Sequence, residues 1–228
     1  MKWALYAGCL LLGLCLEVRG HDPNKTPITW NREVSRIFYE RCVSCHRDGG
    51  TSFSLMTYRD VQPRIVAIKE QVMAQRMPPW GAVKGFGNFR NDAGLTQEQV
   101  ESIVDWIDGG ARRGNNPNAL PKEPKFKNPA AFKLPKDNIA VSGDMKVERA
   151  LTLDGLWPER VPEGQSFQIV AARPDGSIEP LLWLYEHKQA QRHPFLFRKP
   201  IDLPIGTVIR GVPPDATVVL IAGKKARP

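Results

Sequence analysis

The sequence is poor in cysteine, with four in 228 residues, which excludes a disulfide-dense scaffold of this size. An apolar run from Trp3 to Leu16 is shorter than the roughly 20 residues that span a bilayer. Glycine and proline, 19 and 20 residues, show no regular period, so the chain is not collagen-like. With 42% hydrophobic and 25% charged residues, it has the composition of a globular protein and not of a wholly disordered one.

The N-terminus has the features of a secretory signal peptide. Lys2 precedes the apolar run, and the small residue Gly20 lies four residues after its end, just before a polar stretch that begins at His21. A positive charge, a short apolar core and a small residue at the cleavage position are typical of such signals. We therefore predict a signal peptide over residues 1–20 and a periplasmic or otherwise exported protein. An uncleaved signal anchor, which would hold the chain on a membrane, is the alternative.

Cleavage of that signal would leave two cysteines, both in the sequence Cys42-Val43-Ser44-Cys45-His46. This C-x-x-C-H spacing is the pattern of covalent c-type haem attachment. Two thiols three positions apart can each bond one vinyl group of the same haem, and His46 then serves as the proximal iron ligand. We predict one haem c on Cys42 and Cys45.

Zinc binding, a redox dithiol and a disulfide are the other chemistries that use paired cysteines. A zinc site needs two more Cys or His ligands at suitable spacing, and His21, His187 and His193 lie far from the motif in sequence. A thioredoxin-like dithiol needs a strand–helix context that the flanking residues lack. Haem attachment is the preferred interpretation, and export agrees with it because c-type haem is attached outside the cytoplasm.

Three amphipathic segments accompany the motif. Helices are predicted over 31–42, over 58–76 and from Thr96 to about 108. The second is expected to stop before Met77-Pro78, because a residue that precedes proline is pushed out of the helical region.

Local signals mark the ends of these helices. Asn31 is the predicted N-cap of the first, and Pro63 is tolerable only near the first turn of the second. Thr96 and Gln99 match a capping box, and Gly109 is expected to stop the third helix.

This order of elements resembles the class I c-type cytochromes over residues 28–115. The resemblance implies an all-α haem domain whose sixth iron ligand is a methionine just before a proline, and Met77 matches that position. A thioether opposite a histidine raises the reduction potential. Met73 and Met56 are alternative sixth ligands. Further alternatives are that Met77 fills the protein core and that the sixth site is open. Trp80 would pack either on the porphyrin or in the core.

Three strings look more specifically like haem domains that precede a copper type II, ascorbate-dependent monooxygenase of the peptidylglycine-hydroxylating type. They are RMPPW at 76–80, GNFRND at 87–92 and WIDGGA at 106–111. This resemblance directs attention to copper ligands in the second half of the chain.

Residues 116–139 combine repeated prolines with lysines and lack any helical or strand period. We interpret them as a semi-rigid, solvated linker. The alternative is a basic surface that steers an acidic redox partner protein, in keeping with a net charge of +8. Nucleic acid is not an expected partner of an exported haem protein.

Short apolar segments between Pro/Gly turns predict a small antiparallel β-sandwich over residues 140–225. Strands are expected at 166–172, 178–185, 207–210 and 216–222, with a turn at 173–176. The predicted fold class is thus two domains, an all-α cytochrome c-like domain followed by a small antiparallel all-β sandwich.

The second half also resembles, more weakly, the C-terminal sandwich of those copper monooxygenases. Glu159 and Val161 occupy the positions that correspond to the family's copper-binding histidines. Since copper prefers imidazole and thioether ligands, the resemblance implies the fold and argues against copper. His187 and His193 are interpreted as solvated, because a copper site there lacks a third ligand.

We therefore predict a mono-haem single-electron carrier, with the second half as a docking or structural module, and more readily a non-enzyme than an enzyme. One alternative is a haem-containing subunit or relative of a copper-dependent monooxygenase. Another is a haem ligand sensor with an open sixth site.

Overall fold

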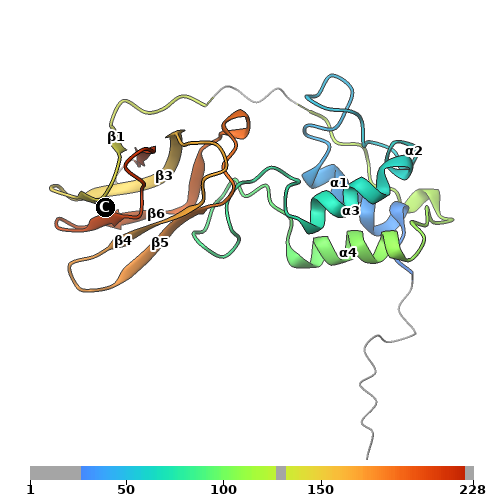
Figure 1. Cartoon of the computed structure of the whole chain (residues 1–228). Helices are drawn as coiled ribbons and strands as arrows, with labels where there is room; N and C mark the ends of the chain where they lie inside the picture. Colours follow the sequence, from blue (N-terminus) through green and yellow to red (C-terminus); the bar gives the residue numbers. More distant parts are fainter. Residues whose placement is uncertain (1–26, 127–131, 224–228) are drawn as a thin grey trace, which may run out of the picture.

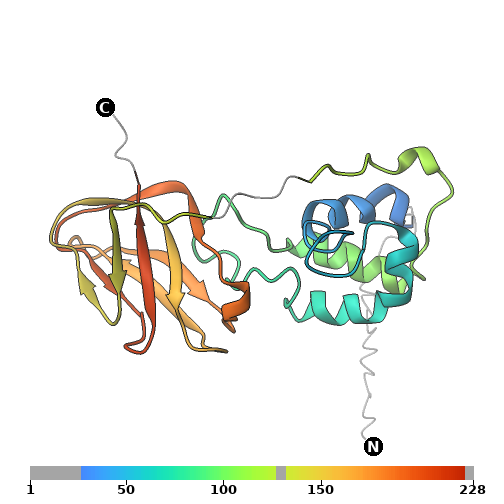
Figure 2. The same ribbon diagram turned by 90° about the horizontal axis from the view of Figure 1, so that it is seen from above.

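The computed structural model describes residues 27–126 and 132–223. The signal peptide predicted over 1–20 lies outside these residues, as does part of the predicted linker. Helices gather at one end of the molecule and two β-sheets at the other (Figure 1), and the view turned by 90° shows the same division (Figure 2). Within the described residues, no helix is both long and apolar enough to cross a membrane.

The helical region, residues 30–77 and 93–119, is built from short elements. They are the π-helical turn η1 (Trp30–Val34), α1 (Ser35–Arg41), α2 (Tyr58–Val61), the 3-10 turn η2 (Gln62–Arg64), α3 (Ile65–Met73), α4 (Gln97–Asp108) and the 3-10 turn η3 (Pro117–Ala119). They enclose a core in which Trp30 packs against Phe38 and Trp106, with ring centroids 5.1 and 6.0 Å apart.

The predicted ends of these helices are partly confirmed. The capping box of α4 is present, since Thr96 Oγ1 accepts from Gln99 N and Gln99 Oε1 accepts from Thr96 N. The N-cap prediction for Asn31 is wrong. Its side-chain amide instead donates to the carbonyl oxygens of Gly114 and Asn116, because the chain turns into the helix earlier, at the extended Thr29.

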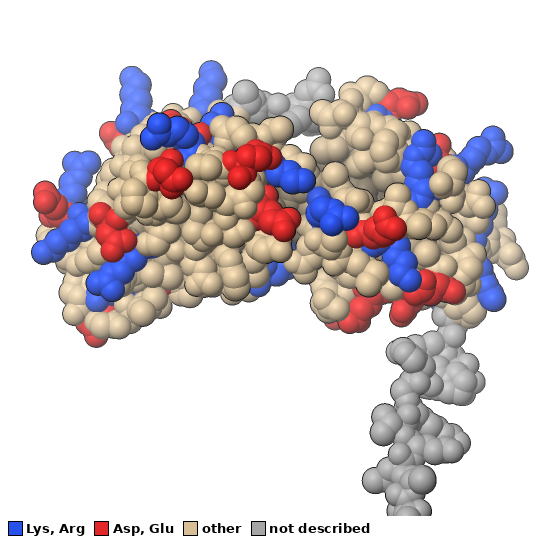
Figure 3. Space-filling view, viewed as in Figure 1, with Lys and Arg blue, Asp and Glu red and all other residues tan. Residues whose placement is uncertain are grey.

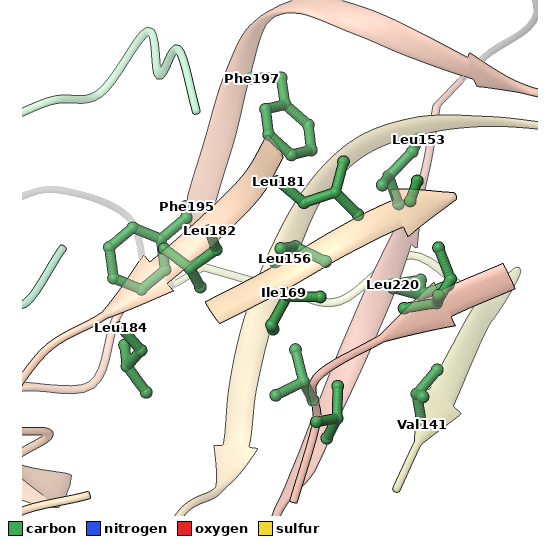
Figure 4. Packing of buried hydrophobic residues seen from close by; sticks show 14 of the residues in the cluster. Val141, Leu153, Leu156, Ile169, Leu181, Leu182, Leu184, Phe195, Phe197 and Leu220 are labelled. Carbon is green, nitrogen blue, oxygen red and sulfur yellow. The ribbon is translucent and has the colours of Figure 1, made fainter. Parts of the chain in front are cut away.

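The sheet region, residues 138–222, has eight strands. They are β1 (Asn138–Val141), β2 (Met145–Lys146), β3 (Leu151–Arg160), β4 (Phe167–Ala172), β5 (Ile178–Leu184), β6 (Phe195–Leu203), β7 (Val208–Arg210) and β8 (Thr217–Ala222). Two four-stranded antiparallel sheets result, in the orders β1-β8-β3-β6 and β2-β7-β4-β5. Leucine, isoleucine and phenylalanine side chains from both sheets meet between them (Figure 4).

The four segments expected to be strands are strands, whereas β1, β2, β3 and β6 were not predicted. Gly155 and Pro158 lie within β3, and Pro200 lies within β6; such residues weaken a strand signal in sequence. Gly155 is required by packing, because a Cβ there would lie 2.4 Å from the carbonyl oxygen of Phe195.

The predicted fold class is wrong. The described chain is mostly β-structure: eight strands in two antiparallel sheets, against short helices of which the longest, α4, has 12 residues. The first half is also not a self-contained all-α unit. Residues 78–92, expected inside it, run to the sheet region, where Ala82 bridges Leu184 and Phe89 bridges Phe197.

Residues 78–92 pack on the sheet region because their aromatic side chains are buried there. The 78–92 segment has no helical period that could fold its rings onto the helical core. Trp80 and Phe89, each 5% exposed, pack instead with Phe195 in the core of the sheet region, at ring distances of 5.0 and 5.5 Å.

Candidate haem-attachment site

The C-x-x-C-H motif forms a tight turn that continues directly from α1. Cys42 N donates to Phe38 O at 2.9 Å, and the amides of Cys45 and His46 donate to Cys42 O at 3.2 and 3.0 Å. Residues three positions apart in such a turn lie on the same side of it. The two thiols are therefore neighbours, and in the described structure neither forms a disulfide.

The imidazole of His46 is oriented by a backbone contact. Its Nδ1 donates to the carbonyl oxygen of Phe53 at 3.1 Å, and its ring meets the Phe53 ring edge-on at 4.7 Å. The hydrogen bond selects the tautomer whose Nε2 carries a free lone pair, which is how a metal-binding histidine is normally held.

A close return of the chain makes this contact possible. Gly50 passes beside the motif so tightly that a Cβ there would lie 2.3 Å from Cys45 O. The amide of Leu55 then donates to His46 O at 3.0 Å, which holds the 47–55 loop against the motif.

The two thiols differ in environment. Burial raises the pKa of Cys42 to about 12, whereas Cys45 is exposed. Throughout residues 27–126 and 132–223, no group of three or more His, Cys, Asp and Glu residues is placed to hold a metal ion.

An exposed aromatic ring and two arginines lie beside the motif. Phe53, beside His46, is 51% exposed and offers an apolar face. The Nε atoms of Arg41 and Arg47, which flank the motif, are buried and have no hydrogen-bond partner in the described structure. An apolar ring could cover Phe53. The guanidinium of Arg41 is already engaged, because its Nη1 donates to Asp92 O at 2.8 Å and its Nη2 pairs with Glu40 at 3.0 Å.

Met77, the predicted sixth iron ligand, lies just after the end of α3. Met77 is partly buried, and its amide donates to Gln71 O at 3.2 Å. It lines a pocket together with Leu95, Val100 and Tyr185, and among the described residues that pocket does not include the motif. The assignment of Met77, Met73 or Met56 as sixth ligand stays a prediction.

The interpretation of the two sheet-region histidines as solvated is wrong for His187, whereas His193 is partly exposed. His187 is buried, and its Nε2 lies 3.1 Å from Gln189 Oε1. His193 Nε2 donates to Trp80 O at 2.9 Å, and the two rings stack at 4.8 Å. Sequence reasoning missed this role because a backbone carbonyl partner leaves no pattern in the chain.

Aromatic contacts also hold the described ends of the predicted linker. Arg47, next to His46, lies over the Phe126 ring at 4.4 Å, and Phe132 stacks on Trp157 of β3 at 5.4 Å. The segment is thus not merely solvated at these two points. On the face seen in Figure 3, basic and acidic side chains are interspersed, without a broad basic patch.

Comparisons of the chain with protein-family models, curated proteins and solved structures give no match. What the chain does is therefore inferred from its own residues.

Proposed function

We propose that this chain binds one haem c through Cys42 and Cys45, with His46 as the proximal ligand, and carries single electrons. The observation that carries the proposal is the His46 Nδ1–Phe53 hydrogen bond beside two free thiols at C-x-x-C-H spacing. It supplies an imidazole with a fixed direction and a free Nε2. The likeness to c-type cytochromes is proposed for this motif and not for the fold.

A bound haem would supply one-electron exchange between ferric and ferrous iron. The chain's own residues would anchor and orient it. Cys42 and Cys45 would hold its edge, Phe53 would exclude water from one side, and Arg47, next to His46, would pair with one of its carboxylates. Met77 is the proposed sixth ligand.

We also propose that the protein is exported. The charge, apolar run and small residue of the predicted signal peptide over residues 1–20 support this. The proposed haem supports it too, because c-type haem is attached outside the cytoplasm. A redox partner protein with an acidic surface would complement the net charge of +8.

The test is to express the full chain with haem maturation and to measure haem that stays on the denatured protein, with metal analysis of the same sample. We expect one iron per chain and no copper. The double change Cys42→Ala/Cys45→Ala should abolish covalent haem, and His46→Ala should remove the low-spin spectrum. His187→Gln, away from the motif, is the control and should bind haem normally.

A wild-type chain that takes up no covalent haem would contradict the proposal. Stoichiometric copper would support a relative of the copper-dependent monooxygenases instead.

A ligand sensor with an open sixth site is the second candidate. It is favoured by the position of Met77 in a pocket that does not include the motif. A high-spin spectrum that shifts when carbon monoxide is added to the ferrous protein would support the sensor and exclude the six-coordinate carrier.

A further inference from the structure

His193 connects the sheet region to the segment that follows Met77. Its Nε2 donates to the carbonyl oxygen of Trp80 at 2.9 Å, and its ring stacks on the indole with centroids 4.8 Å apart and planes inclined by 20°. Trp80 is 5% exposed and meets Phe195 at 5.0 Å, so the contact is part of the core of the sheet region.

The backbone after Trp80 is held by the same region. Gly81 O accepts from Tyr185 N at 2.9 Å, and Val83 N donates to Trp183 O at 3.0 Å. Ala82 forms the bridge to Leu184 between these two bonds. Residues 81–83 thus lie along the end of β5 as a short added strand.

Met77 lies between this anchor and the end of α3. On one side, the amides of Arg76 and Met77 donate to Gln71 O at 2.9 and 3.2 Å. On the other, only Pro78 and Pro79 separate it from Trp80, and three residues span no more than about 10 Å. Because proline fixes φ, Pro78 and Pro79 form a stiff connection, and a displacement of Trp80 also moves Met77.

From these contacts we infer that His193 is a positioning residue for Met77: the sheet region holds the loop that presents the sixth ligand. The ligand role of Met77 in this inference rests on the proposed function. The sheet region would then position the loop that carries Met77, in addition to any docking role.

The first test needs no haem. Hydrogen–deuterium exchange is measured at the Val83 and Tyr185 amides in the full chain. His193→Phe keeps a ring on Trp80 and removes the donor, so both amides should exchange about fivefold faster, as expected for the loss of one hydrogen bond. His193→Gln, whose amide reaches the same carbonyl, should restore slow exchange. The matched control His187→Gln should leave both amides unchanged.

The second test uses the haem-loaded full chain and the weak red absorption band that a methionine–ferric iron bond produces. We expect the band in the wild type and in His193→Gln, and its loss or marked weakening in His193→Phe. The covalent haem content should be equal in all three, because His193 does not contact the attachment motif.

The outcomes separate the two proposals. Wild-type exchange rates or an unchanged band in His193→Phe would overturn the inference and leave the haem function standing. A haem-loaded wild type without the band would overturn the link to Met77. A wild type without covalent haem would overturn the proposed function, and the exchange data would then still decide whether His193 holds the loop.

Discussion

Arg90 and Asp154, 64 residues apart, form a two-point ion pair with nitrogen–oxygen distances of 2.9 and 2.8 Å. Arg90 Nη1 also donates to Phe197 O at 2.7 Å. The arginine comes from the 78–92 segment, Asp154 from β3 and Phe197 from β6. One side chain therefore fastens this segment to two neighbouring strands of the same sheet.

We expect Arg90→Ala to lower the free energy of unfolding by about 1–2 kcal/mol, because it removes a bidentate charged pair and a bond to a backbone carbonyl. Partial exposure of the pair limits the effect. Urea denaturation measures it. Arg173→Ala is the control: it breaks a single 3.1 Å contact with Glu179 and should cost less than about 1 kcal/mol. Equal costs would contradict the anchoring role of Arg90.

Gly211 should tolerate no side chain. Its φ is +92°, and a Cβ would lie 1.9 Å from the carbonyl oxygen of Gln168 in β4. We expect Gly211→Ala to cost about 3 kcal/mol or more, because the backbone of β4 must move. Gly143→Ala, at φ +70° with no atom within 4 Å, should cost only about 1 kcal/mol from backbone strain. Thermal unfolding of both variants gives the comparison, and similar losses would refute the steric explanation.

Asp60 makes the helical region sensitive to acid. Burial acts to raise its pKa, but hydrogen bonds from Ser54 and Thr57, with Arg64 nearby, outweigh burial and lower it. A carboxyl with a lowered folded-state pKa stabilises the fold above its unfolded pKa of about 4, and this stability is lost as pH falls through the folded pKa.

Asp60→Asn should therefore be less stable than the wild type at neutral pH, by about 1 kcal/mol for a lost capping interaction. The difference should shrink progressively below about pH 4. Denaturant titrations over a pH series test this. A difference that stays constant down to acid pH would show that the charge of Asp60 is not what stabilises the helix.

The two motif thiols should react at very different rates in the chain before haem attachment. The pKa of Cys42, raised by burial to about 12, leaves almost no thiolate at mildly alkaline pH, whereas Cys45 is exposed. Iodoacetamide should alkylate Cys45 in the native protein and both residues after denaturation. Mass spectrometry of the peptides identifies the sites, and equal native rates would contradict the raised pKa of Cys42.

The features predicted correctly depend on residues close together in the chain. The capping box needs only Thr96 and Gln99, and the strand predicted over 166–172 lies directly before the Pro/Gly turn at 173–176. The predictions failed where distant segments decide. Pro158 and Gly155 conceal β3 in sequence, yet its pairing with β6 and β8 forms the centre of one sheet.

The sequence by itself determined the spacing of the two thiols and His46, since the turn depends on bonds between residues three and four apart. Only the tertiary structure decided that Phe53 O orients His46, and that Trp80 leaves the helical region to stack on His193. The physical reason is that the helical core and the sheet core are alternative places in which an aromatic side chain can be buried. An aromatic side chain is buried where the folded chain leaves room for it, and that depends on segments which no local pattern identifies.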